Sequence, residues 1–216
     1  MNFRAFIFDM DGLLFDTENL YLIHSKETEK EIGYSIPPEL HTEAIGRTFP
    51  DVKRIFLDRL GQDFPMDHFM QRTNERVYEH VERYGMPVKP GAVELLQALK
   101  VRGIMTILAS SSAYWMIEKN LAAAQLTSYF DLIVSGEEVE HGKPAPDIFL
   151  LAAERAGLEP YECVVLEDSN NGALAGCAAG MRTVMIPDVK PPTLEVAEKV
   201  FKIFPSLSSL LYEKWW

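Results

Sequence analysis

Short apolar runs alternate with longer amphipathic stretches along most of the chain, which predicts strands and helices in turn. The apolar runs lie at residues 4–9, 104–109, 131–134, 163–166 and 182–186, with a weaker edge strand at 200–204. Helical patterns fill the intervals between the later runs. Because strands that alternate with helices form parallel, doubly wound sheets, we expect an α/β fold.

One long stretch interrupts this alternation directly after the first strand. From Thr17 to Tyr84 the apolar positions recur at helical spacing, so no strand is expected there. The stretch runs into Gly85-Met-Pro-Val-Lys-Pro-Gly91, where two glycines and two prolines indicate a linker. We therefore expect a helical module, residues 17–87, inserted into a core made of residues 1–16 and 88–216. Ligands of open α/β sheets bind beyond the carboxyl ends of the strands, so the module is expected to be a lid.

Composition and net charge limit the size of the core, the kinds of partner and the compartment that we expect. The 216 residues are 47% hydrophobic, which suffices for one sizeable core and a smaller module. A net charge of -11 argues against a nucleic-acid partner and against attraction to an anionic membrane. Two cysteines, Cys163 and Cys177, indicate a reduced interior. No signal-like segment and no apolar run of the roughly 20 residues that span a bilayer occurs. We expect a cytoplasmic monomer.

Polar side chains of four kinds fall at the carboxyl ends of the expected strands. They are the carboxylates Asp9 and Asp11, the hydroxyls Ser110, Ser111 and Ser112, the cation Lys143, and the carboxylates Glu167 and Asp168. Each set alone is a weak signal, because strand ends are loops and loops are polar. A parallel sheet, however, gathers all four along one edge, and this coincidence indicates a site.

These groups suit phosphoryl transfer. A carboxylate can attack phosphorus and form an acyl-phosphate. Oxygen ligands from Asp9, Asp168 and a carbonyl suit Mg²⁺, which neutralises the repulsion between nucleophile and phosphate. Lys143 and Ser110 can donate to the transferring oxygens. A second carboxylate, Asp11, can protonate the leaving oxygen and then deprotonate a water.

The same residues carry a family resemblance. The motifs read Phe8-Asp-Met-Asp-Gly-Leu-Leu-Phe-Asp-Thr17, Ile107-Leu-Ala-Ser-Ser-Ser112, Gly142-Lys-Pro-Ala-Pro-Asp-Ile-Phe149 and Val165-Leu-Glu-Asp-Ser-Asn-Asn-Gly172. In this order they resemble the haloacid dehalogenase superfamily, in its β-phosphoglucomutase-like branch with a helical cap. The resemblance covers nearly the whole chain and implies a Rossmann-like core with an inserted small helical cap.

The resemblance also implies a role for each strand-end residue. Asp9 would be the nucleophile and a metal ligand, and Asp11 the general acid and base whose backbone carbonyl also binds Mg²⁺. Ser110, Ser111 and Lys143 would bind the phosphoryl group. Asp168 would be a metal carboxylate, and Glu167 a second ligand or its support.

Departures from the family pattern bear on the reaction. Haloacid dehalogenases proper lack the second aspartate of the first motif, so Asp11 argues against dehalogenation. The sugar phosphomutases of this branch use a histidine, a lysine and an arginine of the cap, near positions that Tyr21, Thr73 and Phe49 occupy here. Hydrolysis of a sugar phosphate or nucleotide-like monoester is therefore favoured. A phosphomutase is the alternative, and a non-enzymatic receiver module that accepts a phosphoryl group is a distant third.

The expected cap offers fewer candidates. Arg47, after Gly46, belongs either to a substrate-recognition loop or to a turn with a solvated arginine. Tyr21 is a second possible substrate contact, and His24 fits a structural role better than a ligand role. Asp16 and Thr17 would form the hinge of the cap.

Overall fold

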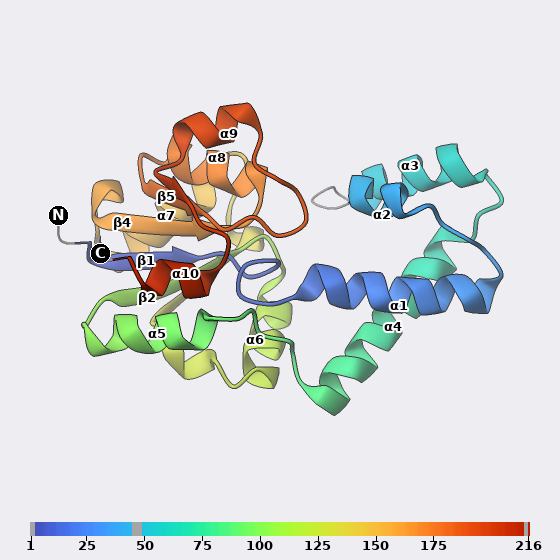
Figure 1. Cartoon of the computed structure of the whole chain (residues 1–216), viewed down its shortest axis with the longest axis horizontal. Helices are drawn as coiled ribbons and strands as arrows, with labels where there is room; N and C mark the ends of the chain where they lie inside the picture. The colour runs from blue at the N-terminus through green and yellow to red at the C-terminus, as the bar shows by residue number, and fades with distance from the viewer. Residues whose placement is uncertain (1–2, 45–48, 214–215) are drawn as a thin grey trace. The chain divides into compact units, whose positions relative to one another are not determined.

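Two compact units make up the chain. The computed structural model describes residues 3–44, 49–213 and 216. One unit, here called the core unit, comprises Met1–Asp16 with Met86–Trp216, and the other, the helical unit, is Thr17–Gly85. The first strand thus folds with the second half of the chain, although the helical unit separates them in sequence (Figure 1).

A parallel sheet forms the centre of the core unit. Over the described residues it has six strands, in the order β3-β2-β1-β4-β5-β6. The strands are β1 (Ala5–Phe8), β2 (Met105–Ser110), β3 (Leu132–Ser135), β4 (Cys163–Glu167), β5 (Arg182–Met185) and β6 (Lys202–Ile203). Ile7 of the central strand pairs with Ile107 on one side and Val165 on the other. The expected α/β fold with a parallel sheet is confirmed.

Side chains of β1 are buried on both faces of the sheet, which explains its uninterrupted apolar run. Ala5 and Ile7 pack in the core beneath helices α7 (Asp147–Ala156) and α8 (Asn170–Ala178). Phe6 and Phe8 alternate with them, so they point to the opposite face. That face is covered by α5 (Ala92–Val101) and α10 (Leu207–Leu211), as Figure 1 shows.

Further elements complete the core unit. They are helix α6 (Tyr114–Ala123), helix α9 (Leu194–Lys199) and the 3-10 helices Thr127–Tyr129, Gly136–Glu138 and Pro160–Glu162. The sequence pattern did not indicate α9 or α10, because a helix of six or five residues is too short to display a helical repeat. Their starts carry a local signal nonetheless: the Thr193 and Ser206 hydroxyls accept hydrogen bonds from the backbone of Val196 and Ser209.

The helical unit has a core of its own. It contains α1 (Thr17–Ile32), α2 (Pro38–Ala44), α3 (Phe49–Leu60) and α4 (Met66–Tyr84), with α1 packed against α4. Buried aromatic side chains of Phe56, Phe64 and Phe69 lie at its centre. Within its described residues no strand occurs, and the predicted helical insertion between the first and second strands is confirmed. In the described part of the chain, no helix combines the length and the apolar character needed to cross a membrane.

The two connections to the helical unit pair with each other inside the core unit. Phe15 and Val88 form an antiparallel bridge. Hydrogen bonds flank it, from Asp16 N to Pro87 O at 2.9 Å and from Lys89 N to Leu14 O at 2.9 Å. The chain therefore leaves and re-enters the core unit through one short two-stranded ladder.

Candidate active site

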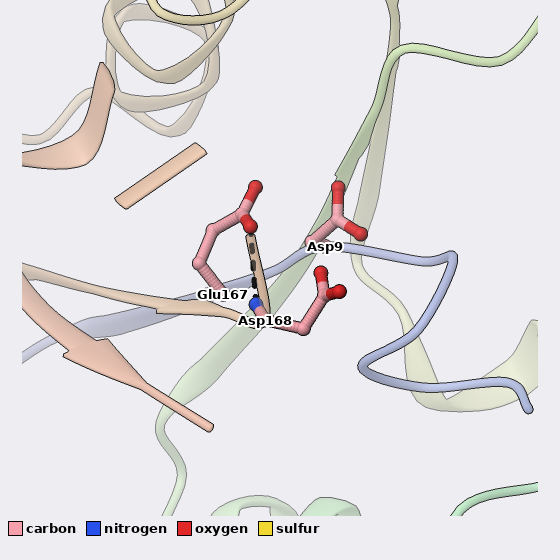
Figure 2. Close-up of side chains that lie close together, drawn as sticks. All are labelled: Asp9, Glu167 and Asp168. Atoms are coloured by element: carbon pink, nitrogen blue, oxygen red, sulfur yellow. Dashed lines mark hydrogen bonds between the residues drawn. The ribbon is translucent and has the colours of Figure 1, made fainter. Parts of the chain in front are cut away.

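Three carboxylates meet where β1 and β4 end. The backbone N–H of Asp9 donates to Leu166 O at 3.0 Å, which sets Asp9 beside Glu167 and Asp168 of the neighbouring strand. One oxygen of each carboxylate lies within 4.8 Å of the others. Figure 2 shows Asp9 and Asp168 with their carboxylates on the same side, while one Glu167 oxygen turns to the backbone nitrogen of Asp168. The topology thus brings together residues that are about 160 positions apart.

Lys143 supplies the positive charge of this cluster. Its Nζ donates to Asp9 Oδ1 at 2.5 Å and to Glu167 Oε1 at 2.6 Å, and its side chain is 8% exposed. Burial alone lowers the pKa of Lys143, but the charges of Asp9 and Glu167 raise that pKa above its ordinary value. The lysine is therefore a fixed cation at the edge of the sheet.

The second oxygen of Glu167 is fully engaged by the protein. Oε2 accepts from the backbone nitrogens of Asp168 and Ser169, both at 3.1 Å, and from the Ser169 hydroxyl at 2.9 Å. Oε1 is held by Lys143. These contacts favour the supporting role for Glu167 over direct ligation of a metal, although its carboxylate lies within the acidic group.

The cluster carries more negative charge than Lys143 offsets. Burial raises the pKa of Asp9 to about 7, even though Lys143 opposes the shift. Burial raises the pKa of Asp168 to about 10, and the charges of Glu167, Asp9 and Asp188 add to that effect. Buried carboxylates that share a site favour either a proton or a bound cation. The candidate ligand atoms of this acidic group are all carboxylate oxygens. Mg²⁺ prefers oxygen ligands, so the residues present fit this ion.

Asp11 and the serine run meet at the same edge. The Ser112 hydroxyl donates to Asp11 Oδ2 at 3.0 Å, and Ser112 N donates to Ser110 Oγ at 3.1 Å. Ser110 is buried and Ser111 is exposed. Gly12, with φ of 85°, permits the turn that follows. The sequence pattern places Ser112 at this edge but gives it no role of its own. Its contact with Asp11 depends on how two loops fold and has no signature in sequence.

Asp188 is a residue of this region that the motifs do not contain. It lies three positions beyond β5 and follows Pro187, which ends the expected strand 182–186. A Cβ on Gly12 would lie 2.4 Å from Asp168 Oδ2 and 3.3 Å from Asp188 Oδ2, so both oxygens border the same small space. Asp188 Oδ2 is buried and has no hydrogen-bond partner among the described residues. An acidic residue just past a strand end was the available signal.

The candidates of the expected cap lie in the helical unit or outside the described residues. Tyr21 is a partly exposed residue of α1. Thr73 is buried, and its hydroxyl donates to Thr28 Oγ1 at 3.2 Å, so it serves the packing of α4 on α1. His24 is buried and bonds Glu27 at 3.0 Å. Arg47 lies outside the described residues.

Comparison with known proteins assigns the family. The sequence matches the haloacid dehalogenase-like hydrolases over residues 6–186. The chain belongs to this family. The superfamily membership expected from the four motifs is confirmed, and with it the expectation of an enzyme of the hydrolase class.

Individual relatives share most of their length with this chain. A Drosophila melanogaster protein named "Probable pseudouridine-5'-phosphatase" is 37% identical over 84% of this chain and 80% of its own length. Hexitol phosphatase B of Escherichia coli strain K12 is 34% identical over 85% of this chain and 83% of its own length. The crystal structure of a hydrolase of this family from Deinococcus radiodurans R1, with bound phosphate and sodium, is similar with a TM-score of 0.80 at 27% identity, covering 96% and 93% of the two chains.

Proposed function

We propose that the protein is a Mg²⁺-dependent phosphatase that hydrolyses a small phosphorylated metabolite through an aspartyl-phosphate on Asp9. The observation that carries this proposal is the placement of Asp9 between the fixed cation Lys143 and the carboxylate of Asp168. A nucleophilic carboxylate, a lysine that neutralises phosphate charge and a pair of oxygen ligands for a divalent ion are the groups that this reaction needs.

Asp9 would make and break the bonds to phosphorus. Its free oxygen attacks the phosphorus atom, and the bond from phosphorus to the ester oxygen breaks. Lys143 donates to the other oxygen of Asp9, so it orients the nucleophile and lies near the transferring oxygens. Attack of water on the phosphorus then breaks the bond to Asp9 and releases inorganic phosphate, which restores the carboxylate.

Asp11 would move the protons of both steps. It gives a proton to the leaving oxygen, so that a neutral alcohol departs, and later takes one from the attacking water. The Ser112 hydroxyl donates to Asp11 Oδ2 at 3.0 Å and so helps to hold this carboxylate at the edge of the sheet. The two aspartates thus divide nucleophilic and acid-base chemistry between them.

Asp9 and Asp168 would hold the Mg²⁺ ion, with the backbone carbonyl of Asp11. The ion, when bound, supplies positive charge that lowers the repulsion between the nucleophile and the phosphate. Glu167 keeps Lys143 and the backbone after β4 in position.

The substrate class we propose is a sugar phosphate or a nucleotide-like monoester. The names of two similar proteins, a hexitol phosphatase and a pseudouridine-5'-phosphatase, support this class. The candidates for contacting the leaving group remain Tyr21 and Arg47.

The test is phosphate release from a panel of sugar phosphates and nucleoside monophosphates with MgCl₂. Asp9→Asn should release no phosphate above background, whereas the exposed Asp58→Asn on α3 should keep wild-type rates. Acid quenching followed by borohydride reduction should convert residue 9 of the wild type into homoserine. No turnover on the whole panel would contradict the proposal.

The same assay separates the two rival functions. A phosphomutase would interconvert isomers of a sugar phosphate much faster than it releases phosphate. A receiver module would retain its acyl-phosphate for hours. Steady release of phosphate that is not outpaced by isomer interconversion excludes the mutase, and a short-lived acyl-phosphate excludes the receiver.

A further inference from the structure

A lysine fixes the carboxylate of Asp188 in one orientation. Lys89 Nζ donates to Asp188 Oδ1 at 2.6 Å. Oδ1 is thereby occupied, and the buried, unpartnered Oδ2 faces the space beside Gly12 and Asp168. The Asp188 side chain is 14% exposed, so solvent offers Oδ2 little compensation. A buried carboxylate oxygen without a donor is costly, which indicates that a donor belongs there.

The lysine itself is held on two sides. Lys89 N donates to Leu14 O within the ladder that connects the core unit to the helical unit. Lys89 Nζ also donates to Asp16 Oδ1 at 3.1 Å. Its backbone and its ammonium group are thus both anchored, so the direction from which it meets Asp188 is set by the fold.

We propose that Asp188 is a further residue of the Mg²⁺ site and that Lys89 is its positioning residue; this rests on the Mg²⁺-dependent function proposed above. Among the described residues, the carboxylates that gather within 4.8 Å are Asp9, Glu167 and Asp168, and Asp188 lies outside that group. We therefore place Asp188 in contact with a water on the ion and not with the ion itself. Mg²⁺ in proteins retains several waters, and Asp188 Oδ2 accepts a hydrogen bond from one of them.

This arrangement joins the metal site to the start of the helical unit. Lys89 bonds both Asp188, beside the acidic cluster, and Asp16, the last residue before the helical unit begins. The ammonium group of Lys89 thus bonds two carboxylates. One is Asp188, which accepts a hydrogen bond from a metal-bound water on this proposal, and the other is Asp16, which precedes the helical unit.

The test measures Mg²⁺ binding directly, by titrating metal-free protein with MgCl₂ alone in a calorimeter. In Asp188→Asn the amide oxygen keeps the bond from Lys89, so the amide NH₂ replaces Oδ2 and presents donors where an acceptor is needed. We expect the Mg²⁺ dissociation constant to rise by about 10- to 100-fold, the usual effect of losing such a partner. Lys53 and Asp67 form an exposed lysine–aspartate pair at 2.7 Å in the helical unit, and Asp67→Asn serves as the control with wild-type affinity.

A double variant tests the positioning role. In Asp188→Asn with Lys89→Met the amide can rotate and offer its oxygen, so part of the lost affinity should return, beyond any change that Lys89→Met makes alone. Simple additivity of the two substitutions would rule out positioning by Lys89. Asp188→Ala, which removes Oδ2 altogether, replaces Asp188→Asn if the latter does not fold, and the same rise of about 10- to 100-fold in the Mg²⁺ dissociation constant is expected.

The outcomes distinguish this inference from the proposed function. Wild-type protein that binds no Mg²⁺ and releases no phosphate would defeat the proposed function itself. Wild-type protein that does both, with an unchanged dissociation constant in folded Asp188→Asn, would overturn only the role of Asp188.

Discussion

The carboxylate of Glu167 occupies the space that a side chain on Gly172 would need. A Cβ at Gly172 would lie 1.8 Å from Glu167 Oε1 and 1.9 Å from its Cδ. The first turn of α8 thus carries glycine because β4 ends with an engaged glutamate beneath it. The two residues belong to one motif, and their contact gives a physical reason for its Glu-Asp-Ser-Asn-Asn-Gly pattern.

Gly172→Ala should therefore disturb the site without touching a charged residue. The new methyl group displaces Glu167, which releases Lys143 Nζ from Oε1. We expect a loss of about 1–3 kcal/mol in the free energy of unfolding, typical of overpacking, together with at least a tenfold fall in phosphatase rate. Gly142→Ala is the control, because nothing lies within 4 Å of its Cβ position. If Gly172→Ala had the same urea midpoint and the same phosphatase rate as the wild type, the prediction would be wrong, because the site would then accommodate the methyl group.

Removal of Lys143 should make stability depend more strongly on Mg²⁺. Lys143→Met leaves buried Asp9 and Glu167 without their cation, which costs roughly 3–5 kcal/mol when one partner of a buried pair is lost. On the proposed function, Mg²⁺ bound to Asp9 and Asp168 would restore part of the missing positive charge. Urea unfolding with EDTA and with MgCl₂ should therefore show a larger Mg²⁺-induced gain in this variant than in wild type.

The control for that comparison is an exposed lysine. Lys199 pairs with Glu195 at 2.7 Å on the surface of α9, where solvent screens the attraction between the two charges. Lys199→Met should keep both the stability and the Mg²⁺ response of wild type. An equal Mg²⁺ gain in wild type and Lys143→Met would mean that the ion and the lysine do not share the same carboxylates.

The positions of the strands along the chain and the polar residues at their ends could be predicted because they depend on local patterns. Buried parallel strands appear as short apolar runs, and the residue after each run must lie at the carboxyl edge of the sheet. Asp9, at the end of the first run, and Lys143, in the loop after the run 131–134, are predicted to lie at this edge, and the structure brings them into direct contact. Each strand had to be located to within only one or two residues for the argument to hold.

The contacts that could not be predicted depend on the direction of side chains and on the paths of loops. Asp188 follows a proline beyond the apolar run of β5, and nothing in the sequence tells that its carboxylate turns toward Asp168. The sequence groups Ser112 with the other serines but does not pair it with Asp11, because that contact joins loops of two different strands. Contacts of this kind are set by tertiary packing and leave no periodic signal.

The two cysteines should differ sharply in reactivity. Cys163 begins β4, has no exposed surface, and burial raises the pKa of its thiol to about 11. Because the thiolate is the reactive form, folded protein at pH 8 should alkylate slowly at this position. Cys177, which is partly exposed on α8, should react first with iodoacetamide. Mass spectrometry of the digested protein gives both rates, and comparable labelling of the two would contradict the buried placement of β4.

The helical unit should depend for its stability on its aromatic cluster. Phe69 of α4 is 2% exposed and lies 5.6 Å from Phe64 and 6.0 Å from Phe56, measured between ring centroids. Phe69→Ala leaves a cavity among these rings and should cost about 3–5 kcal/mol. Leu22→Ala is the control in the same unit, because Leu22 is 42% exposed and its loss should stay within about 0.5 kcal/mol. Urea unfolding followed by circular dichroism measures both, and a small effect of Phe69→Ala would mean that the helical unit is held together by other contacts.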